Sequence, residues 1–145
     1  WIAGVDDKWV EFDSWESMAS AVPTAAKLFL AGGSRDLEVF CQRSDIDLLV
    51  RGLNLQKLKK KYNNIIILES LPNNSYELEA RLLRSYAITH ICCKNSGGGF
   101  SQAKLRAARQ LGVPVWMLAR PPLPSAAPFY HVLHDLDAIK QALAC

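Results

Sequence analysis

The sequence predicts an α/β domain in which helices cover both faces of a mainly parallel sheet of about five strands, forming a three-layer sandwich. Five short apolar runs carry this prediction, because their spacing suits one strand plus a crossover helix. They are residues 27–31, 46–50, 64–68, 88–92 and 114–118. Most of the runs are continuously apolar rather than alternating, which is typical of strands that are buried on both faces.

One helix is expected before the first apolar run and one after it. Asp13 and Glu16 resemble a capping box, which predicts a helix over residues 14–21, and Pro23 prevents that helix from extending further. Acidic residues suited to a first helical turn predict a second helix over residues 34–42. These helices would join parallel strands by right-handed crossovers.

The later helices are marked by residues suited to their ends. Residues 53–62 form either a short helix or an irregular basic loop. Ser75 is a candidate N-cap ahead of an apolar stripe with helical spacing. Ser101 is expected to cap a helix over residues 102–111, which Gly112 ends.

Length and composition fit one globular domain. The chain has 145 residues, of which 50% are hydrophobic and 21% charged, and this balance excludes disorder, collagen and a coiled coil. The apolar runs are far shorter than the ~20 residues that a membrane-spanning helix needs. A proline-rich connector over residues 120–128 and a final helix over residues 135–144 complete the predicted elements. The first residue is not methionine, which indicates a piece of a longer protein.

A cluster of basic residues follows the second apolar run. Its members are Arg51, Lys57, Lys59, Lys60 and Lys61. The formal net charge is only +3 and no aromatic series accompanies the cluster, so a solvated face or loop is the favoured interpretation. A basic nucleic-acid-binding domain is the weakest of the alternatives, and it predicts steeply salt-dependent binding.

The cysteines and histidines do not form a recognisable metal site. Cys41, Cys92, Cys93 and Cys145 lack C-x-x-C spacing, and the three histidines do not complete a ligand set. Cys92 and Cys93 lie in an apolar run and are predicted to be small buried residues. We therefore expect no metal site, and a reducing, cytoplasmic location.

Two glycine-rich loops are the strongest candidates for a ligand site. Residues 31–35 and residues 94–99 each follow a predicted strand and open a predicted helix. Ligands of open parallel sheets bind at such loops, where backbone amides and a helix N-terminus favour anions. Each loop also carries a hydroxyl group and a cation (Ser34 and Arg35, Ser96 and Lys94). The sequence therefore predicts binding of an anionic ligand.

Residues for covalent catalysis are not apparent in either loop. The first loop is not a Walker A motif, and neither loop is a complete G-x-G-x-x-G fingerprint. No G-x-S-x-G turn surrounds a serine, and no paired carboxylates stand near the loops. We therefore expect the chain to bind and position a ligand, with a cofactor carrying any reaction.

The segment over residues 88–122 carries a specific pattern: K-N-S-G-G after a strand, then A-K-L, A-A-R-Q-L-G and P-V. This pattern resembles that of the precorrin-6A reductases of cobalamin biosynthesis. The matching positions are Lys94, Asn95, Ser96, Gly97, Gly98, Ala103, Lys104, Leu105, Ala107, Ala108, Arg109, Leu111, Gly112 and Pro114. Residues 28–37 match a second family segment at Gly33, with two threonines replaced, and residues 8–12 resemble the strand that leads into this part of the enzyme.

The resemblance covers about residues 8–124 and implies an enzyme with two Rossmann-like halves. Residues 1–145 would form a single Rossmann-like domain, the C-terminal half, and the glycine-rich segment that opens the first half is missing. In the family, NADPH and the tetrapyrrole lie in the cleft between the halves, and one double bond of precorrin-6A or cobalt-precorrin-6A is reduced. The N-terminal half is thus an expected partner, and the isolated chain is expected to have little or no reductase activity.

The resemblance also implies site residues. It places Lys94, Asn95, Ser96, Gly97 and Gly98 in the cleft, flanked by Gly33, Ser34 and Arg35, with Lys94 as a candidate proton source. From the residue spacing and composition described above, we also expect no metal, no membrane and no nucleic-acid partner. The main alternative is a non-catalytic α/β module that binds a nucleotide or an acidic metabolite through the same two loops.

Overall fold

The computed structural model describes residues 1–121, and the structural statements below concern these residues. The predicted helix over residues 135–144, most of the proline-rich connector and Cys145 lie outside the described residues. No helix among residues 1–121 is long and apolar enough to cross a membrane.

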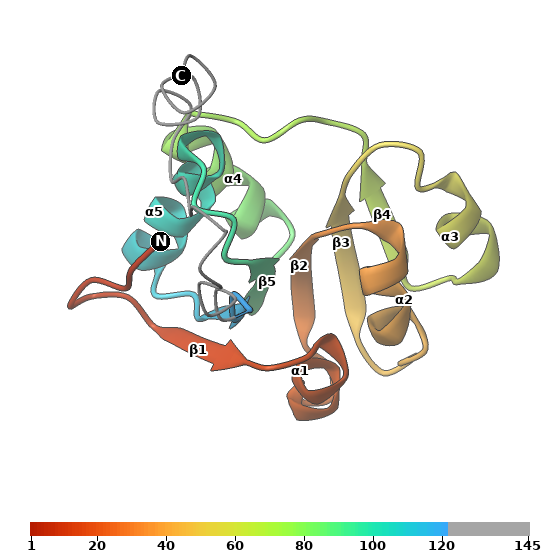
Figure 1. Ribbon diagram of the computed structural model, residues 1–145. Helices are drawn as coiled ribbons and strands as arrows, with labels where there is room; N and C mark the ends of the chain where they lie inside the picture. Colours follow the sequence, from red (N-terminus) through yellow and green to blue (C-terminus); the bar gives the residue numbers. More distant parts are fainter. Residues whose placement is uncertain (122–145) are drawn as a thin grey trace, which may run out of the picture.

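Six parallel strands form one sheet in the order β1-β6-β5-β2-β3-β4 (Figure 1). Their bounds are β1 Trp9–Phe12, β2 Lys27–Ala31, β3 Asp47–Arg51, β4 Ile65–Leu68, β5 His90–Lys94 and β6 Val115–Leu118. The five strands expected from the apolar runs are confirmed, within two residues at each end. The sixth, β1, lies at the edge of the sheet beside β6 and was indicated only by the family resemblance.

The helices form two layers, one on each face of the sheet (Figure 1). Helices α1, α2 and α3 cover one face, and α4 and α5 pack against each other on the opposite face. Their bounds are α1 Trp15–Ala21, α2 Ser34–Cys41, α3 Gln56–Lys61, α4 Tyr76–Ser85 and α5 Gln102–Leu111, with a 3₁₀ turn at Gly99–Ser101. The predicted α/β sandwich with a parallel sheet is thus confirmed.

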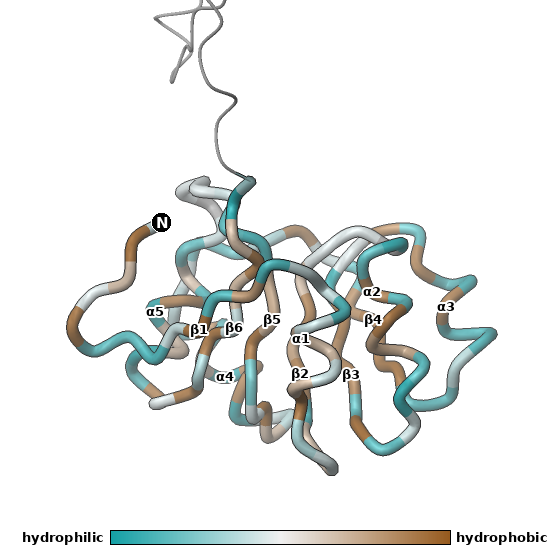
Figure 2. Tube along the Cα trace, turned by 60° about the horizontal axis from the view of Figure 1, so that its bottom comes forward, coloured by the Kyte–Doolittle hydropathy of each residue, from teal (hydrophilic) through white to brown (hydrophobic). Residues whose placement is uncertain are grey.

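Successive residues of the central strands point to opposite faces of the sheet. In β2, Leu28 and Leu30 pack into the core beneath α1, α2 and α3, whereas Phe29 packs into the core beneath α4 and α5. All three side chains are fully buried. Figure 2 shows hydrophobic residues concentrated along the central strands. Their sequences are continuously apolar because helices cover both faces of these strands.

Two predicted helix caps differ from the structure. Ser14, not Asp13, caps α1, because its Oγ accepts a hydrogen bond from the Ser17 backbone nitrogen at 3.0 Å. Ser101 makes no capping bond with its side chain, since a 3₁₀ turn leads directly into α5. The cap at Ser75 is confirmed by its bond from the Leu78 nitrogen, at 3.3 Å.

The other element boundaries agree with the sequence. Gly112 ends α5 in the left-handed conformation, with φ of 69°. The segment over residues 53–62, left open between a helix and a loop, contains the short helix α3. Four lysines of the basic cluster lie on this helix and are exposed, as the solvated-face interpretation requires; they are Lys57, Lys59, Lys60 and Lys61.

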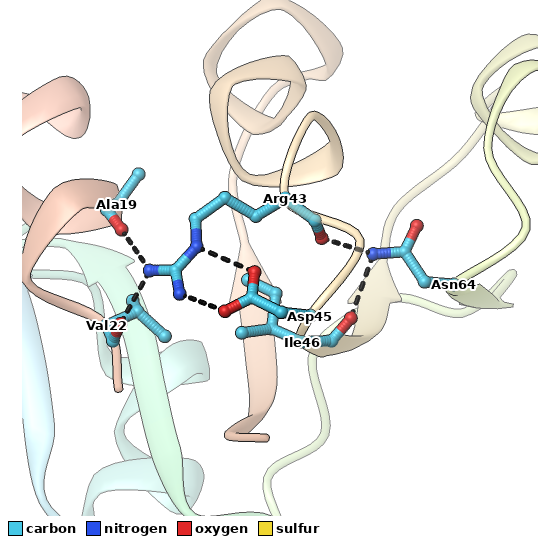
Figure 3. A network of polar contacts seen from close by, with 6 residues as sticks. All are labelled: Ala19, Val22, Arg43, Asp45, Ile46 and Asn64. Carbon is cyan, nitrogen blue, oxygen red and sulfur yellow. Dashed lines mark hydrogen bonds and ion pairs between the residues drawn. The ribbon is translucent and has the colours of Figure 1, made fainter. Parts of the chain in front are cut away.

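Arg43 joins three elements at the edge of the sheet where the strands begin (Figure 3). Its Nη1 donates to the carbonyl oxygens of Ala19 and Val22, at 2.9 and 2.5 Å. These bonds supply donors to carbonyl groups that the C-terminal end of α1 leaves without a partner inside the helix. The rest of its guanidinium is paired with Asp45. Asn64 completes the network by donating to the carbonyl oxygens of Arg43 and Ile46.

We expect the variant Arg43→Met to lower the free energy of unfolding by about 2 kcal/mol. The change removes a charged donor from two helix-end carbonyl groups, and hydrogen bonds of this type contribute about 1.5–3 kcal/mol. Urea unfolding of the chain measures the effect, with Arg81→Met on the exposed face of α4 as the matched control. Equal stability of the two variants would show that the network does not hold α1 to the sheet.

Candidate functional site

The strand order reverses between β5 and β2. From β2 the chain continues outward through β3 to β4, then crosses back to β5 and continues through β6 on the other side. Loops that follow the two strands at such a switch point diverge and leave a crevice beyond the carboxyl ends of the strands. The loops after β2 and β5 are the two glycine-rich segments predicted to bind a ligand.

A cavity of about 450 Å³ lies at this edge of the sheet. Its walls come from the ends of β2, β3 and β5, from the segment after β4, and from the starts of α4 and α5. The lining residues are Ala31 and Gly32, residues 51–53, residues 70–73, Glu79, Cys93, Lys94, Ser96, Ser101 and Lys104. The volume falls within the range of small-molecule sites.

The structure brings two of the predicted residues, Lys94 and Ser96, into the cavity wall. The Lys94 ammonium lies 2.5 Å from a carboxylate oxygen of Asp36, in the first turn of α2. This ion pair joins the start of the second glycine-rich loop to the first turn of α2. The Lys94 side chain is 49% exposed, so the ammonium remains accessible from the solvent.

Asn95, Gly97 and Gly98 shape the loop without lining the cavity. The amide group of Asn95 exchanges two hydrogen bonds with the backbone of Trp1, at 2.8 and 3.0 Å. The carbonyl oxygen of Gly98 accepts a bond from the Trp1 indole at 3.1 Å. Gly97 has a φ of 70°, beside the side chain of Arg120.

The predicted flanking residues lie at the start of α2. Gly33 is the N-cap position, and its carbonyl oxygen accepts from the Asp36 and Leu37 nitrogens. Ser34 is the first residue of the helix. Arg35 is exposed and faces a separate hollow shared with Lys61 of α3, so the structure does not bring it to the cavity.

Arg51 was expected to be solvated with the other basic residues, and this prediction is wrong. Its side chain is only 10% exposed, because it points inward from the end of β3 and forms a bidentate ion pair with Glu79 of α4. Its Nη2 and Nη1 donate to the two carboxylate oxygens of Glu79 at 2.8 and 3.0 Å. Its guanidinium also lies 5.0 Å from the centre of the Phe29 ring. The available signal was its position directly after a buried strand, at the edge where ligands bind.

Lys104 is the other cation that sequence analysis did not place in the site. It lies in the first turn of α5 and is only 6% exposed. Its Nζ donates to the carbonyl oxygen of Ser101 at 3.1 Å and lies 5.0 Å from the centre of the Trp1 ring. Burial lowers the pKa of the Lys104 ammonium.

The cysteines near the site are buried thiols, as predicted. Burial raises the pKa of Cys93, in the cavity wall, to about 11, and also raises the pKa of Cys92. Both therefore remain protonated near neutral pH, which makes them poor nucleophiles. Among residues 1–121, no group of three or more His, Cys, Asp or Glu side chains is arranged to hold a metal ion.

A family model described as precorrin-6x reductase CbiJ/CobK matches residues 1–144 of the chain. The chain belongs to this family. The resemblance found in the K-N-S-G-G segment is thereby confirmed over nearly the whole sequence. The cavity and its cations therefore belong to a member of a family that is named for reductase activity.

Individual members of the CbiJ/CobK family agree with the assignment. The chain is 32% identical over 126 residues to a precorrin-6A reductase of Rhodobacter capsulatus, covering 86% of the chain and 50% of the relative. It is 35% identical over 100 residues to a precorrin-6A reductase of Rhodococcus erythropolis, covering 69% and 40%. The chain thus spans about half the length of these curated relatives.

A solved structure of this family shares the fold. It is described as CobK precorrin-6A reductase, and it superposes with a TM-score of 0.79 at 29% sequence identity. The match covers 99% of this chain and 56% of the other. The α/β architecture is therefore that of a known family member, and the remaining part of that protein has no counterpart in this sequence.

Proposed function

We propose that this chain is the C-terminal half of an NADPH-dependent reductase of precorrin-6A or cobalt-precorrin-6A, acting in the cytoplasmic synthesis of cobalamin. The observation that carries the proposal is a cation-lined cavity at the topological switch point of a CbiJ/CobK family chain. The N-terminal half supplies the other wall of the cleft. Turnover therefore belongs to the assembled enzyme, and ligand binding is the property to measure on this chain.

The chemistry of the cavity suits both ligands. NADPH carries several phosphate groups, and precorrin-6A carries many peripheral carboxylates. Lys104 and the half-exposed Lys94 supply positive charge, and Ser96 and Ser101 supply hydroxyl groups. At Gly98 and Gly99, no atom of residues 1–121 outside the glycine and its chain neighbours lies within 4 Å of the position that a Cβ would occupy, so a ligand can approach the backbone of the loop.

The reduction requires a hydride and a proton. When bound, NADPH would supply the hydride for the double bond, and the residues of this chain would orient it and supply the proton. Lys94 holds a proton on Nζ at the cavity wall, beside Asp36, and can deliver it to the position that the reduction leaves basic. The two glycine-rich loops orient the ligands, and the apolar side chains at the cavity rim exclude water from them.

Replacement of Lys94 with alanine tests the proposal. We expect NADP⁺ binding, measured by calorimetry, to weaken about tenfold or more, because a charge-assisted hydrogen bond contributes about 1.5–3 kcal/mol. Lys59→Ala is the matched control, since Lys59 is exposed on α3 and does not line the cavity. NADP⁺ binding that is equal in both variants would exclude Lys94 from the cofactor site.

A further inference from the structure

Lys104 differs from the other cations of the cavity wall in its surroundings. Arg51 is paired with Glu79, and Lys94 is paired with Asp36. For Lys104, no carboxylate of residues 1–121 lies within ion-pair distance. The described part of the cavity therefore has one buried ammonium group that forms no direct ion pair with a carboxylate.

Burial of a charge in this way is costly unless a partner compensates it. The contacts that Lys104 makes are to neutral groups, the carbonyl oxygen of Ser101 and the indole ring of Trp1. An ammonium group has three N–H donors, and one of them is used by Ser101. Donors therefore remain for an acceptor inside the cavity, which Lys104 lines.

The rim of the cavity indicates which kind of anion would reach Lys104. Leu53 and Leu71 line the cavity with 57% and 73% of their surfaces exposed, and Pro72 lies beside them. A ligand with a broad apolar body and acidic groups at its edge would cover these side chains. A diphosphate would leave them in water.

We infer that Lys104 Nζ anchors one peripheral carboxylate of the tetrapyrrole, whose macrocycle lies against Leu53 and Leu71. The inference rests on the proposed function, and it assigns this part of the cavity to the substrate rather than to the nicotinamide cofactor. Ser101 and Ser96, on the same wall, are positioned to donate to further acidic groups of the ligand.

The test compares binding of two probes to Lys104→Met. Uroporphyrin is a tetrapyrrole whose acidic groups are all carboxylates, and NADP⁺ represents the cofactor. We expect the variant to bind uroporphyrin about tenfold or more weakly and NADP⁺ within about twofold of the original chain. The exposed Lys59→Met serves as the control. Methionine is close to lysine in length and removes a buried charge, so the variant is expected to keep its thermal stability.

A second measurement does not depend on the variant. The pKa of Lys104, followed by NMR in the original chain, is expected to rise when uroporphyrin binds, because a carboxylate stabilises the ammonium. An unchanged pKa, or uroporphyrin binding that Lys104→Met does not weaken, would overturn the inference and leave the proposed function intact. Loss of NADP⁺ binding instead would assign Lys104 to the cofactor. Failure of the original chain to bind uroporphyrin while it still binds NADP⁺ would overturn the inference alone, and failure to bind either probe would contradict both proposals.

Discussion

Replacement of Glu79 with alanine is expected to lower the free energy of unfolding by about 3–5 kcal/mol. The reason is the buried charge that the change leaves behind. Arg51 and Glu79 have side chains that are 10% and 2% exposed, and they neutralise each other through two hydrogen bonds. Removal of one partner of a buried ion pair is strongly destabilising, because the other remains charged without compensation. Urea unfolding of the chain measures the loss.

The double variant Arg51→Met, Glu79→Leu separates the cost of the isolated charge from the value of the pair. Without either charge, the stability is expected to return to within about 1–2 kcal/mol of the original, because buried pairs contribute little compared with apolar groups of similar size. Glu77→Ala, on the exposed side of the same helix, is the control for helix propensity. A loss below about 1 kcal/mol for Glu79→Ala would contradict the buried-pair interpretation.

The same pair determines the shape of the candidate site. Arg51 is the last residue of β3 and Glu79 lies in the first half of α4, and both line the cavity. Their ion pair therefore holds α4 against the end of β3 at the cavity wall. We therefore expect Glu79→Ala to weaken ligand binding as well as stability. The double variant Arg51→Met, Glu79→Leu would restore stability without restoring these two polar side chains of the cavity wall. It would thus distinguish the effect on ligand binding from the effect on stability.

The sequence predicted the sheet well because its central strands are buried on both faces. Continuous apolar runs result from that burial, as at Leu28, Phe29 and Leu30. The edge strand β1 lacks this signal, since its two middle residues, Val10 and Glu11, are exposed. Hydrophobic pattern therefore identifies the apolar strands of this sheet, including the edge strand β4, but does not identify β1.

The site was predictable in part. Placement of ligands beyond the carboxyl ends of strands is a general rule for parallel sheets, so Lys94 and Ser96 were found. The pair of Arg51 and Glu79 depends on which face of the sheet α4 covers, and the two residues are 28 positions apart in the sequence. The hydrophobic pattern does not reveal strand order or the face that each helix covers, so Glu79 could not be recognised as the partner of Arg51. Arg51 was therefore grouped with the exposed lysines that follow it.

Gly97 is the position where the loop after β5 depends most on the absence of a side chain. Its φ of 70° is unfavourable for any residue with a branched Cβ. A Cβ at this position would also lie 2.8 Å from Nη2 of Arg120. That guanidinium donates to the carbonyl oxygens of Asn95 and Ser96, at 2.8 and 3.0 Å, and so holds the loop beside the cavity.

Gly97→Val is accordingly expected to lower the free energy of unfolding by about 2–3 kcal/mol, from backbone strain and from displacement of Arg120. Binding of the tetrapyrrole and of NADP⁺ is expected to weaken together, because the loop positions Lys94 and Ser96. Gly98→Val is the matched control, since Gly98 has an extended backbone with φ of −79° and no non-neighbouring atom of residues 1–121 lies within 4 Å of its Cβ position. Its stability is expected to change by less than about 0.5 kcal/mol. If the two valine variants unfolded at the same urea concentration, the left-handed turn at Gly97 would not be what holds this loop in place.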